Sequence, residues 1–219
     1  MNDDAMDDSN DDSNEDPTRK RMSATKSALR RRILADRDAQ DPALRAAASA
    51  SIVEHLLRLP PVFTARTLCA YVGLDTEIDT APLLAAVLGQ GRRLLLPRVV
   101  DVESHTRRHL VLHQVGDVAR DTRPGRWGIR EPDPAHCPAI DPLEVDLVLL
   151  PGVAFDRRGG RLGHGAGFYD RLLAGLRTDC LRVAAAFSLQ VVPEVPLEPH
   201  DQRFQRLVTE HGEVPLTNE

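Results

Sequence analysis

One stretch of the chain combines a buried strand, a glycine-rich loop and the start of a helix. It runs from Asp146 to Arg171 and reads DLVLLPGVAFDRRGGRLGHGAGFYDR. Five of the fourteen glycines fall within nine positions of this stretch, namely Gly159, Gly160, Gly163, Gly165 and Gly167. Such density lets the backbone adopt positive φ and lets its N–H groups converge on an anion. The stretch therefore predicts a phosphate-binding loop.

Two charged residues flank the glycines. Arg161 supplies a cation for phosphate oxygens, and Asp170 supplies a carboxylate of the kind that holds Mg²⁺ together with substrate phosphates. The common nucleotide motifs do not match, because the stretch has no lysine for G-x-x-x-x-G-K-[ST] and has G-x-G-x-G in place of G-x-G-x-x-G. A flexible hairpin tip before a helix is the alternative, and the residues alone leave it open.

A second candidate comes from a bias in the basic residues. Of the 28 basic side chains only Lys20 and Lys26 are lysines. Lysine is a compact point charge that approaches a phosphate closely, and arginine does not replace it there. Lys26 and Arg30 also lie on one face of a predicted helix because they are four residues apart. This pattern favours a phosphate-binding lysine, while a lysine facing solvent remains an equal alternative.

Periodicity places these residues on an α/β fold. Helices are predicted from Ser23, from Pro42 at N1 after an Asp41 cap to residue 59, over 80–88 and over 167–176. Continuous apolar runs predict buried parallel strands at 67–73, 93–99, 145–150 and 181–187, with an edge strand at 109–115 and a last strand at 206–209. We therefore expect a single α/β domain, with a largely parallel open sheet flanked by helices on both faces.

Composition excludes several classes of protein. The three cysteines have no CxxC spacing, and no segment has the apolar length of a signal sequence core or a membrane span, so we expect a cytoplasmic protein without a membrane partner. The first seventeen residues hold eight acidic and no basic side chains, so residues 18–219 carry +3 although the whole chain carries −5. We predict a disordered acidic tail over residues 1–22, or less favourably a partner-binding arm, before a domain over 23–219. A charge of +3 does not indicate a nucleic-acid partner.

Several motifs together resemble the 5-formyltetrahydrofolate cyclo-ligase family, also called methenyltetrahydrofolate synthetases. They are the 146–171 stretch, KSALR at 26–30, YVGLDTEIDT at 71–80, LPRV at 96–99 and WGIREP at 127–132. The resemblance spans about residues 24–212. It implies an enzyme that uses ATP and Mg²⁺ to convert 5-formyltetrahydrofolate into 5,10-methenyltetrahydrofolate, with ADP and phosphate as products. Its partners would be these small molecules alone, and we expect a monomer.

The resemblance also assigns residues. The ATP-binding positions would be Lys26, Ser27, Ala28, Leu29, Arg30, Arg161, Leu162, Gly163, His164, Gly165, Ala166, Gly167, Phe168 and Tyr169. Lys26, Arg30 and Arg161 would carry catalysis, Val72, Glu77 and Trp127 would contact the folate, and Asp170 and Asp201 would hold Mg²⁺. Glu77 would either orient the polar edge of the folate or assist proton transfer from N10.

The chain departs from the family pattern at three positions. His164 stands where many relatives have Tyr, and Ala166 where many have Gly, which would strain the loop if that position needed positive φ. Gln205 stands where relatives often have Asp, which weakens the assignment of Asp201 to a metal. Without the resemblance, Trp127 is better interpreted as a core residue. The alternative function is a folate- or nucleotide-binding protein without turnover, and a phosphosugar isomerase-like protein is a weaker one that leaves Lys26 unexplained.

Overall fold

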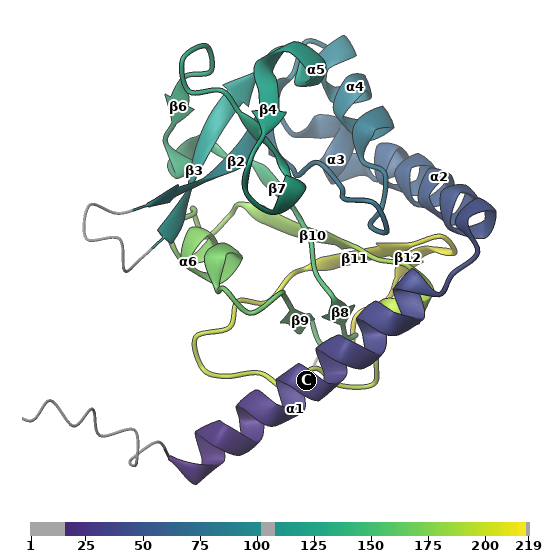
Figure 1. Cartoon of the computed structure of the whole chain (residues 1–219). Coiled ribbons are helices and arrows are strands. Elements are labelled where there is room, and N and C mark those ends of the chain that lie inside the picture. Colours follow the sequence, from purple (N-terminus) through teal and green to yellow (C-terminus); the bar gives the residue numbers. More distant parts are fainter. Residues whose placement is uncertain (1–15, 102–107, 218–219) are drawn as a thin grey trace, which may run out of the picture.

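A computed structural model describes residues 16–101 and 108–217, and Figure 1 shows their arrangement around one large sheet. The strand order is β12-β11-β10-β7-β1-β2-β3-β6. Their bounds are β1 Thr67–Cys69, β2 Arg93–Asp101, β3 Arg108–Val115, β6 Ala139–Ile140, β7 Leu147–Leu150, β10 Leu181–Ala185, β11 Arg206–Thr209 and β12 Gly212–Val214. The run from β11 to β2 is parallel, whereas β12, β3 and β6 are antiparallel to their neighbours. The predicted α/β class and largely parallel sheet are confirmed.

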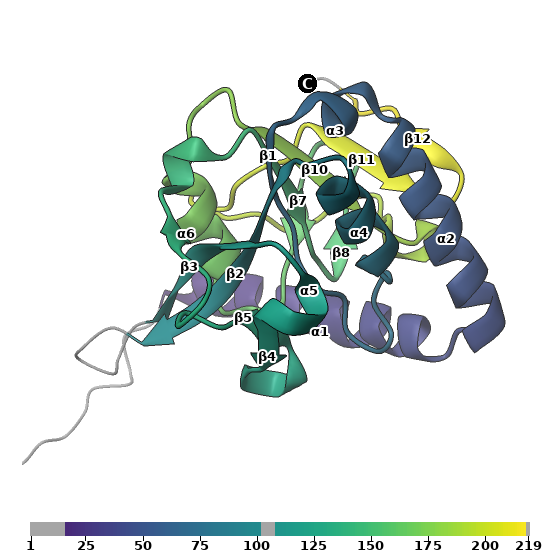
Figure 2. The ribbon, with the colours of Figure 1, turned by 90° about the horizontal axis from the view of Figure 1, so that it is seen from above.

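Helices cover both faces of the sheet, as predicted. The helices α2 (Pro42–Arg58), α3 (Pro60–Thr64) and α4 (Ala81–Gly89) pack on one face, and α6 (Phe168–Ala174) packs on the other (Figure 2). Alternate strand residues enter the two cores, so Leu68 faces α2 and α4 while Cys69 faces α6. Because both faces are covered, the central strands are apolar throughout, and this explains why continuous apolar runs predicted them.

The first helix, α1 (Pro17–Asp38), begins earlier than predicted. The carboxylate of Asp16 accepts a hydrogen bond from Thr18 N at 3.0 Å, and Pro17 occupies N1. Asp41 and Pro42 start α2 in the same way. The prediction of disorder is therefore wrong for residues 17–22, because Asp-Pro is a stronger start signal than Ser23. The rest of the predicted acidic tail, residues 1–15, lies outside the described residues.

The position of α1 matters most for the site. It covers neither face of the sheet but packs on β8 (Ala154–Phe155), β9 (Arg161–Leu162) and η3 (Ser188–Gln190), as the purple helix of Figure 1 shows. These segments follow the carboxyl ends of β7 and β10. Since ligands of open α/β sheets bind outside the carboxyl ends of the strands, α1 brings its side chains to that edge.

The segment between β3 and β6 forms an excursion that periodicity did not predict. It contains α5 (Val118–Asp121), β4 (Thr122–Pro124), η1 (Arg126–Gly128) and β5 (Arg130–Pro132), and η2 (Pro142–Glu144) follows β6. Strands of two or three residues are too short to show a period. Strand β12 escaped prediction for the same reason.

The structure also shows where the cysteines and one buried histidine lie. The three cysteines are free and buried, and His113 is a satisfied core histidine whose Nδ1 lies 2.8 Å from Cys137 O. No helix within residues 16–101 and 108–217 has both the length and the apolar character needed to cross a lipid bilayer.

Candidate functional site

The candidate site begins with the inward face of α1. Lys26 is 8% exposed, and Arg30 is partly buried on the same face one turn later. Leu29 packs on the small core beneath α1, whereas Ser27 and Ala28 face solvent. Of the five predicted nucleotide-binding positions on this helix, Lys26 and Arg30 are therefore the ones whose polar groups point toward the rest of the site.

Lys26 is held by two carboxylates from the other end of the chain. Its Nζ lies 2.7 Å from Glu198 Oε2 and 2.7 Å from Asp201 Oδ2. Burial lowers the pKa of Lys26, but the hydrogen bonds to Asp201 and Glu198 raise it by more, so its pKa lies above the ordinary value. The solvent-facing alternative for Lys26 is thus wrong. The sequence did not single out Glu198, because only the fold brings it to α1.

The glycine-rich stretch divides into two parts. Gly159 and Gly160 belong to the turn of the β8–β9 hairpin, where Asp156 is 2% exposed and accepts from Arg158 N and Gly160 N at 2.8 Å each. A Cβ on Gly160 would lie 2.6 Å from Asp156 Oδ2. The predicted cradle of five glycines is therefore wrong for these two, because Gly160 makes room for the buried Asp156 carboxylate and Gly159 makes room for the backbone carbonyl of Phe204.

The second part, residues 163–167, is a loop beside α1. Arg30 Nε donates to Gly163 O at 2.7 Å. Gly165 and Gly167 have φ of +105° and +63°, which only glycine adopts without strain. The strain anticipated at Ala166 is absent, since Trp127 is the only non-glycine residue with positive φ among those described.

Arg161 and Asp170, the two charges that flank the loop, contact each other. Arg161 Nη2 lies 2.9 Å from Asp170 Oδ1, and the guanidinium also lies 5.7 Å from the centre of the Tyr169 ring. The Arg161 side chain is 3% exposed, and its Nε has no hydrogen-bond partner. A buried guanidinium with an unpaired N–H donor, as in Arg161, is suited to binding an anionic ligand.

Asp170 and Asp201, the predicted magnesium ligands, lie on neighbouring segments. Gln202 N donates to Asp170 Oδ1 at 3.2 Å, which ties α6 to the segment that carries Asp201. No cluster of three or more His, Cys, Asp or Glu residues suited to a metal occurs within the described residues. Gln205 turns away from Lys26, because its Oε1 accepts from Arg182 N at 2.7 Å at the opposite end of β10.

Glu77 lies beside the loop on a turn that follows β1. Its Oε2 accepts from Leu74 N at 3.1 Å, and its Oε1 lies 3.6 Å from His164 Nε2. Burial raises the pKa of the Glu77 carboxyl, but His164, Leu74 N–H and Arg37 lower it by more, so the pKa lies below its usual range. An ionised carboxylate of low basicity suits an orienting role better than proton transfer from N10.

The turn that carries Glu77 depends on one glycine. A Cβ on Gly73 would lie 2.0 Å from Ile78 O, so no other residue fits there. Thr80 Oγ1 closes the turn by donating to Tyr71 O at 2.7 Å. Val72, a predicted folate contact, lies on this turn and packs partly buried against the main core.

Trp127 is not a core residue. It is 60% exposed with φ of +57°, and its ring centre lies 6.2 Å from that of Phe168 at the end of the loop. An exposed aromatic side chain on a strained backbone is typical of a binding surface. The core interpretation is thus wrong, and Trp127 borders the same loop as the predicted ATP-binding residues.

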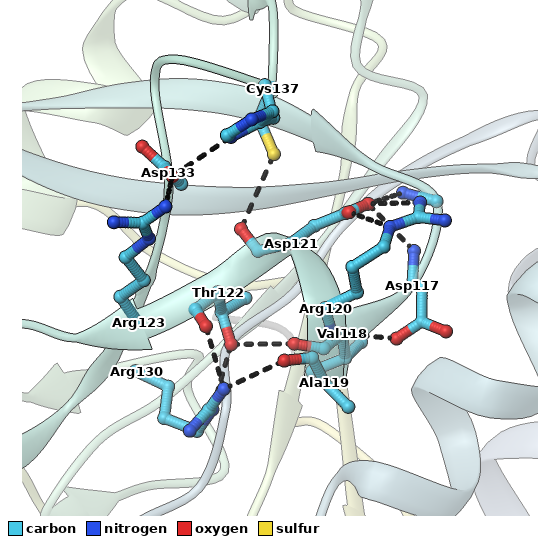
Figure 3. Close-up of polar contacts among 12 residues, drawn as sticks. Asp117, Val118, Ala119, Arg120, Asp121, Thr122, Arg123, Arg130, Asp133 and Cys137 are labelled. Atoms are coloured by element: carbon cyan, nitrogen blue, oxygen red, sulfur yellow. Dashed lines mark hydrogen bonds and ion pairs between the residues drawn. The ribbon is translucent and has the colours of Figure 1, made fainter.

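A polar network fixes the excursion that presents Trp127 (Figure 3). Asp121 is 7% exposed and accepts from Gly116 N at 2.8 Å, Asp117 N at 2.9 Å and Arg120 Nε at 2.7 Å. Arg130 Nη2 donates to Thr122 O at 2.7 Å across the β4–β5 hairpin. Next to the hairpin lies an open cavity of about 390 Å³, lined by Arg98, Val99, Val100, Asp101, Gly125, Arg126 and Glu131.

Comparison with known proteins supports one family. Residues 22–210 match the model of the 5-formyltetrahydrofolate cyclo-ligase family. The chain is 34% identical over 190 residues to the 5-formyltetrahydrofolate cyclo-ligase of Mycolicibacterium smegmatis, covering 84% of this chain and 93% of that protein. It is 32% identical over 210 residues to that of Saccharomyces cerevisiae, covering 87% and 98%.

A solved structure agrees in fold. The NMR structure of Aquifex aeolicus 5,10-methenyltetrahydrofolate synthetase superimposes with a TM-score of 0.75 at 33% identity, covering 89% of this chain and 94% of that one. The shared fold therefore covers most of the chain.

Proposed function

Since the chain belongs to the 5-formyltetrahydrofolate cyclo-ligase family, we propose that it converts 5-formyltetrahydrofolate and ATP into 5,10-methenyltetrahydrofolate, ADP and phosphate. One observation carries the proposal. Lys26 and Arg30 on α1, the 163–167 loop and the Glu198–Asp201 segment meet at the carboxyl edge of the sheet, through Lys26 Nζ to Asp201 Oδ2 at 2.7 Å and Arg30 Nε to Gly163 O at 2.7 Å. The site thus combines a glycine loop with three cations, Lys26, Arg30 and Arg161, and such cations stabilise a transferring phosphoryl group.

The reaction needs the formyl oxygen to become a leaving group. The γ-phosphoryl group of ATP passes to that oxygen, and ADP leaves. N10 then attacks the formyl carbon, the C–O bond breaks, and phosphate departs with the oxygen while N10 loses its proton. Lys26, Arg30 and Arg161 offset the charge of the moving phosphoryl group, and the loop amides hold the phosphate oxygens.

The residues present fit Mg²⁺ as a companion of the nucleotide. Mg²⁺ is usually held by one or two carboxylates together with substrate phosphates and water. Asp170 and Asp201 are two such carboxylates on segments that the Gln202 hydrogen bond joins, and they would hold the ion. When bound, Mg²⁺ would neutralise negative charge on the phosphates.

Glu77 and Trp127 would bind the folate. Glu77 is 13% exposed at its side chain and ionised, so it suits the donor groups of a pterin ring. Trp127 offers an exposed ring beside Phe168.

We also propose that the protein is cytoplasmic and monomeric. Size-exclusion chromatography with light scattering would test whether it is a monomer.

The decisive experiment mixes the purified full chain with 5-formyltetrahydrofolate and MgATP. We expect the near-ultraviolet band of methenyltetrahydrofolate to rise and ADP to be released in equal amount. Tight binding of both substrates without ADP release would favour the alternative of a binding protein without turnover. A folded chain that neither binds nor reacts would refute both.

A further inference from the structure

Arg37 is a buried cation that the reaction outlined above leaves unused. It is 7% exposed, and it lies on α1 three turns after Lys26 and two turns after Arg30, on the same inward face. Unlike those two residues, it was not singled out from the sequence, because it is one arginine among many. Its side chain is buried, whereas those of Arg31 and Arg32 on the same helix are exposed.

The guanidinium of Arg37 has no hydrogen bond within the described part of the chain. The nearest carboxylate oxygens are Glu77 Oε1 at 3.7 Å from Nη1 and Asp38 Oδ1 at 3.9 Å from Nε. Its Nε is shielded from solvent and has no partner. Leaving buried donors unsatisfied is costly, so such a group in a native fold calls for an explanation.

The place of Arg37 supplies that explanation. Its Nη1 faces Glu77, which in turn lies 3.6 Å from His164 in the 163–167 loop. The guanidinium donors of Arg37 therefore lie next to the ionised carboxylate of Glu77, where the turn that carries Glu77 meets the 163–167 loop. A ring edge that carries N–H donors beside a carbonyl oxygen would satisfy both side chains at once.

We propose that Arg37 is a further substrate-binding residue, whose guanidinium donates to the 4-oxo oxygen of the pterin while Glu77 accepts from the neighbouring N3–H and 2-amino groups. This inference rests on the proposed function and deepens it. The Arg37–Glu77 pair then selects 2-amino-4-oxo rings against 2,4-diamino rings, because the diamino ring presents a donor where Arg37 needs an acceptor.

The test compares two small probes, a 2-amino-4-oxo tetrahydropteridine and its 2,4-diamino counterpart, bound to the full chain. Calorimetry gives each dissociation constant, and fluorescence of Trp127, the single tryptophan, gives a second readout. We expect wild-type protein to prefer the 4-oxo probe by about tenfold or more. In Arg37→Gln the preference should fall to about twofold or less, whereas Arg32→Met, an exposed arginine on the same helix, should keep it.

A purely structural Arg37 would predict another result, namely that Arg37→Gln weakens both probes equally and leaves their ratio unchanged. That result, or a wild-type protein that binds both probes alike, would overturn the proposal. If Arg37→Gln does not fold, Arg37→Met is tested in its place, because methionine keeps a long apolar side chain but has no donor, and an unchanged ratio in that variant would overturn the proposal equally. Turnover by wild-type protein is measured first, since its absence refutes the proposed function and not the role of Arg37 alone.

Discussion

Replacing Lys26 by methionine should separate its structural role, which is to pair with Glu198 and Asp201, from its proposed role in binding the nucleotide phosphates. Methionine keeps most of the volume but removes the charge, which leaves the carboxylates of Glu198 and Asp201 facing each other's negative charge. Removing one partner of a fully buried pair costs about 3–5 kcal/mol. Here the side chains of Glu198 and Asp201 are 29% and 12% exposed, so we expect a loss of about 2–3 kcal/mol.

This loss should depend on pH with a definite sign. Burial raises the pKa of Asp201, but Lys26 and the Glu198 N–H lower it by more, and Lys26 also lowers the pKa of Glu198. Their contribution is therefore present at neutral pH and is lost as the pH falls through their lowered folded-state pKa values. Without Lys26 both carboxyls titrate at higher pH, so the difference between variant and wild type should shrink as the solution is acidified.

The assays are urea denaturation at pH 7 and at successively lower pH, thermal unfolding at pH 7, and turnover of 5-formyltetrahydrofolate. Lys26→Met should lower the midpoint of thermal unfolding by roughly 4–12 °C and reduce kcat/KM by about a hundredfold or more. Lys20→Met is the matched control, since Lys20 is exposed on the same helix. It should change neither quantity.

A triple variant decides between the two roles. Adding Glu198→Gln and Asp201→Asn to Lys26→Met removes the unpaired charges, so stability should return while activity should not. If stability does not return, the two carboxylates are not what Lys26 stabilises. If activity returns, Lys26 does not act on the nucleotide and the reasoning from its burial and spacing is refuted.

Three further outcomes follow from other parts of the site. Gly73→Ala should destabilise the chain by about 3 kcal/mol or more and abolish folate binding, because its Cβ would meet Ile78 O at 2.0 Å. Gly89→Ala is the control in the same denaturation and binding assays, and it should be neutral because the space around its Cβ is open. Trp127→Gly removes an exposed ring from a position with φ of +57°, so the free energy of unfolding should stay within about 1 kcal/mol while folate affinity measured by calorimetry falls about tenfold; unchanged affinity would contradict the proposed contact. Because the pKa of Glu77 lies below its usual range, its contribution to stability is lost only as the pH falls through that lowered pKa. Acidification from about pH 8 to 5 should therefore not reduce the difference in unfolding free energy between Glu77→Gln and wild type, and a reduction within that range would show that the carboxyl titrates there.

Local signals in the sequence were enough for six of the eight strands of the large sheet and for the face of α1. Buried parallel strands are apolar on both faces, so 147–150 and 181–185 stood out as uninterrupted runs. The i,i+4 spacing of Lys26 and Arg30 gave their shared face. By contrast, the three-residue strands of the excursion carry no period, and the buried polar network around Asp121 depends on neighbours that meet only after folding.

The ion-pair partner of each charged side chain could not be predicted from local sequence patterns, for a related reason. Lys26 and Glu198 are 172 residues apart, and Arg37 and Glu77 meet only because α1 crosses the turn after β1. Sequence patterns indicate which cations can bind a phosphate. They do not indicate which carboxylates neutralise those cations when no phosphate is bound. In this chain, predicted phosphate-binding cations and predicted magnesium-binding carboxylates pair with one another, Arg161 with Asp170 and Lys26 with Asp201. In the proposed reaction, binding of the magnesium nucleotide would then exchange these partners, each cation taking phosphate and each carboxylate taking metal, so that none of these four charged side chains is left without an oppositely charged partner.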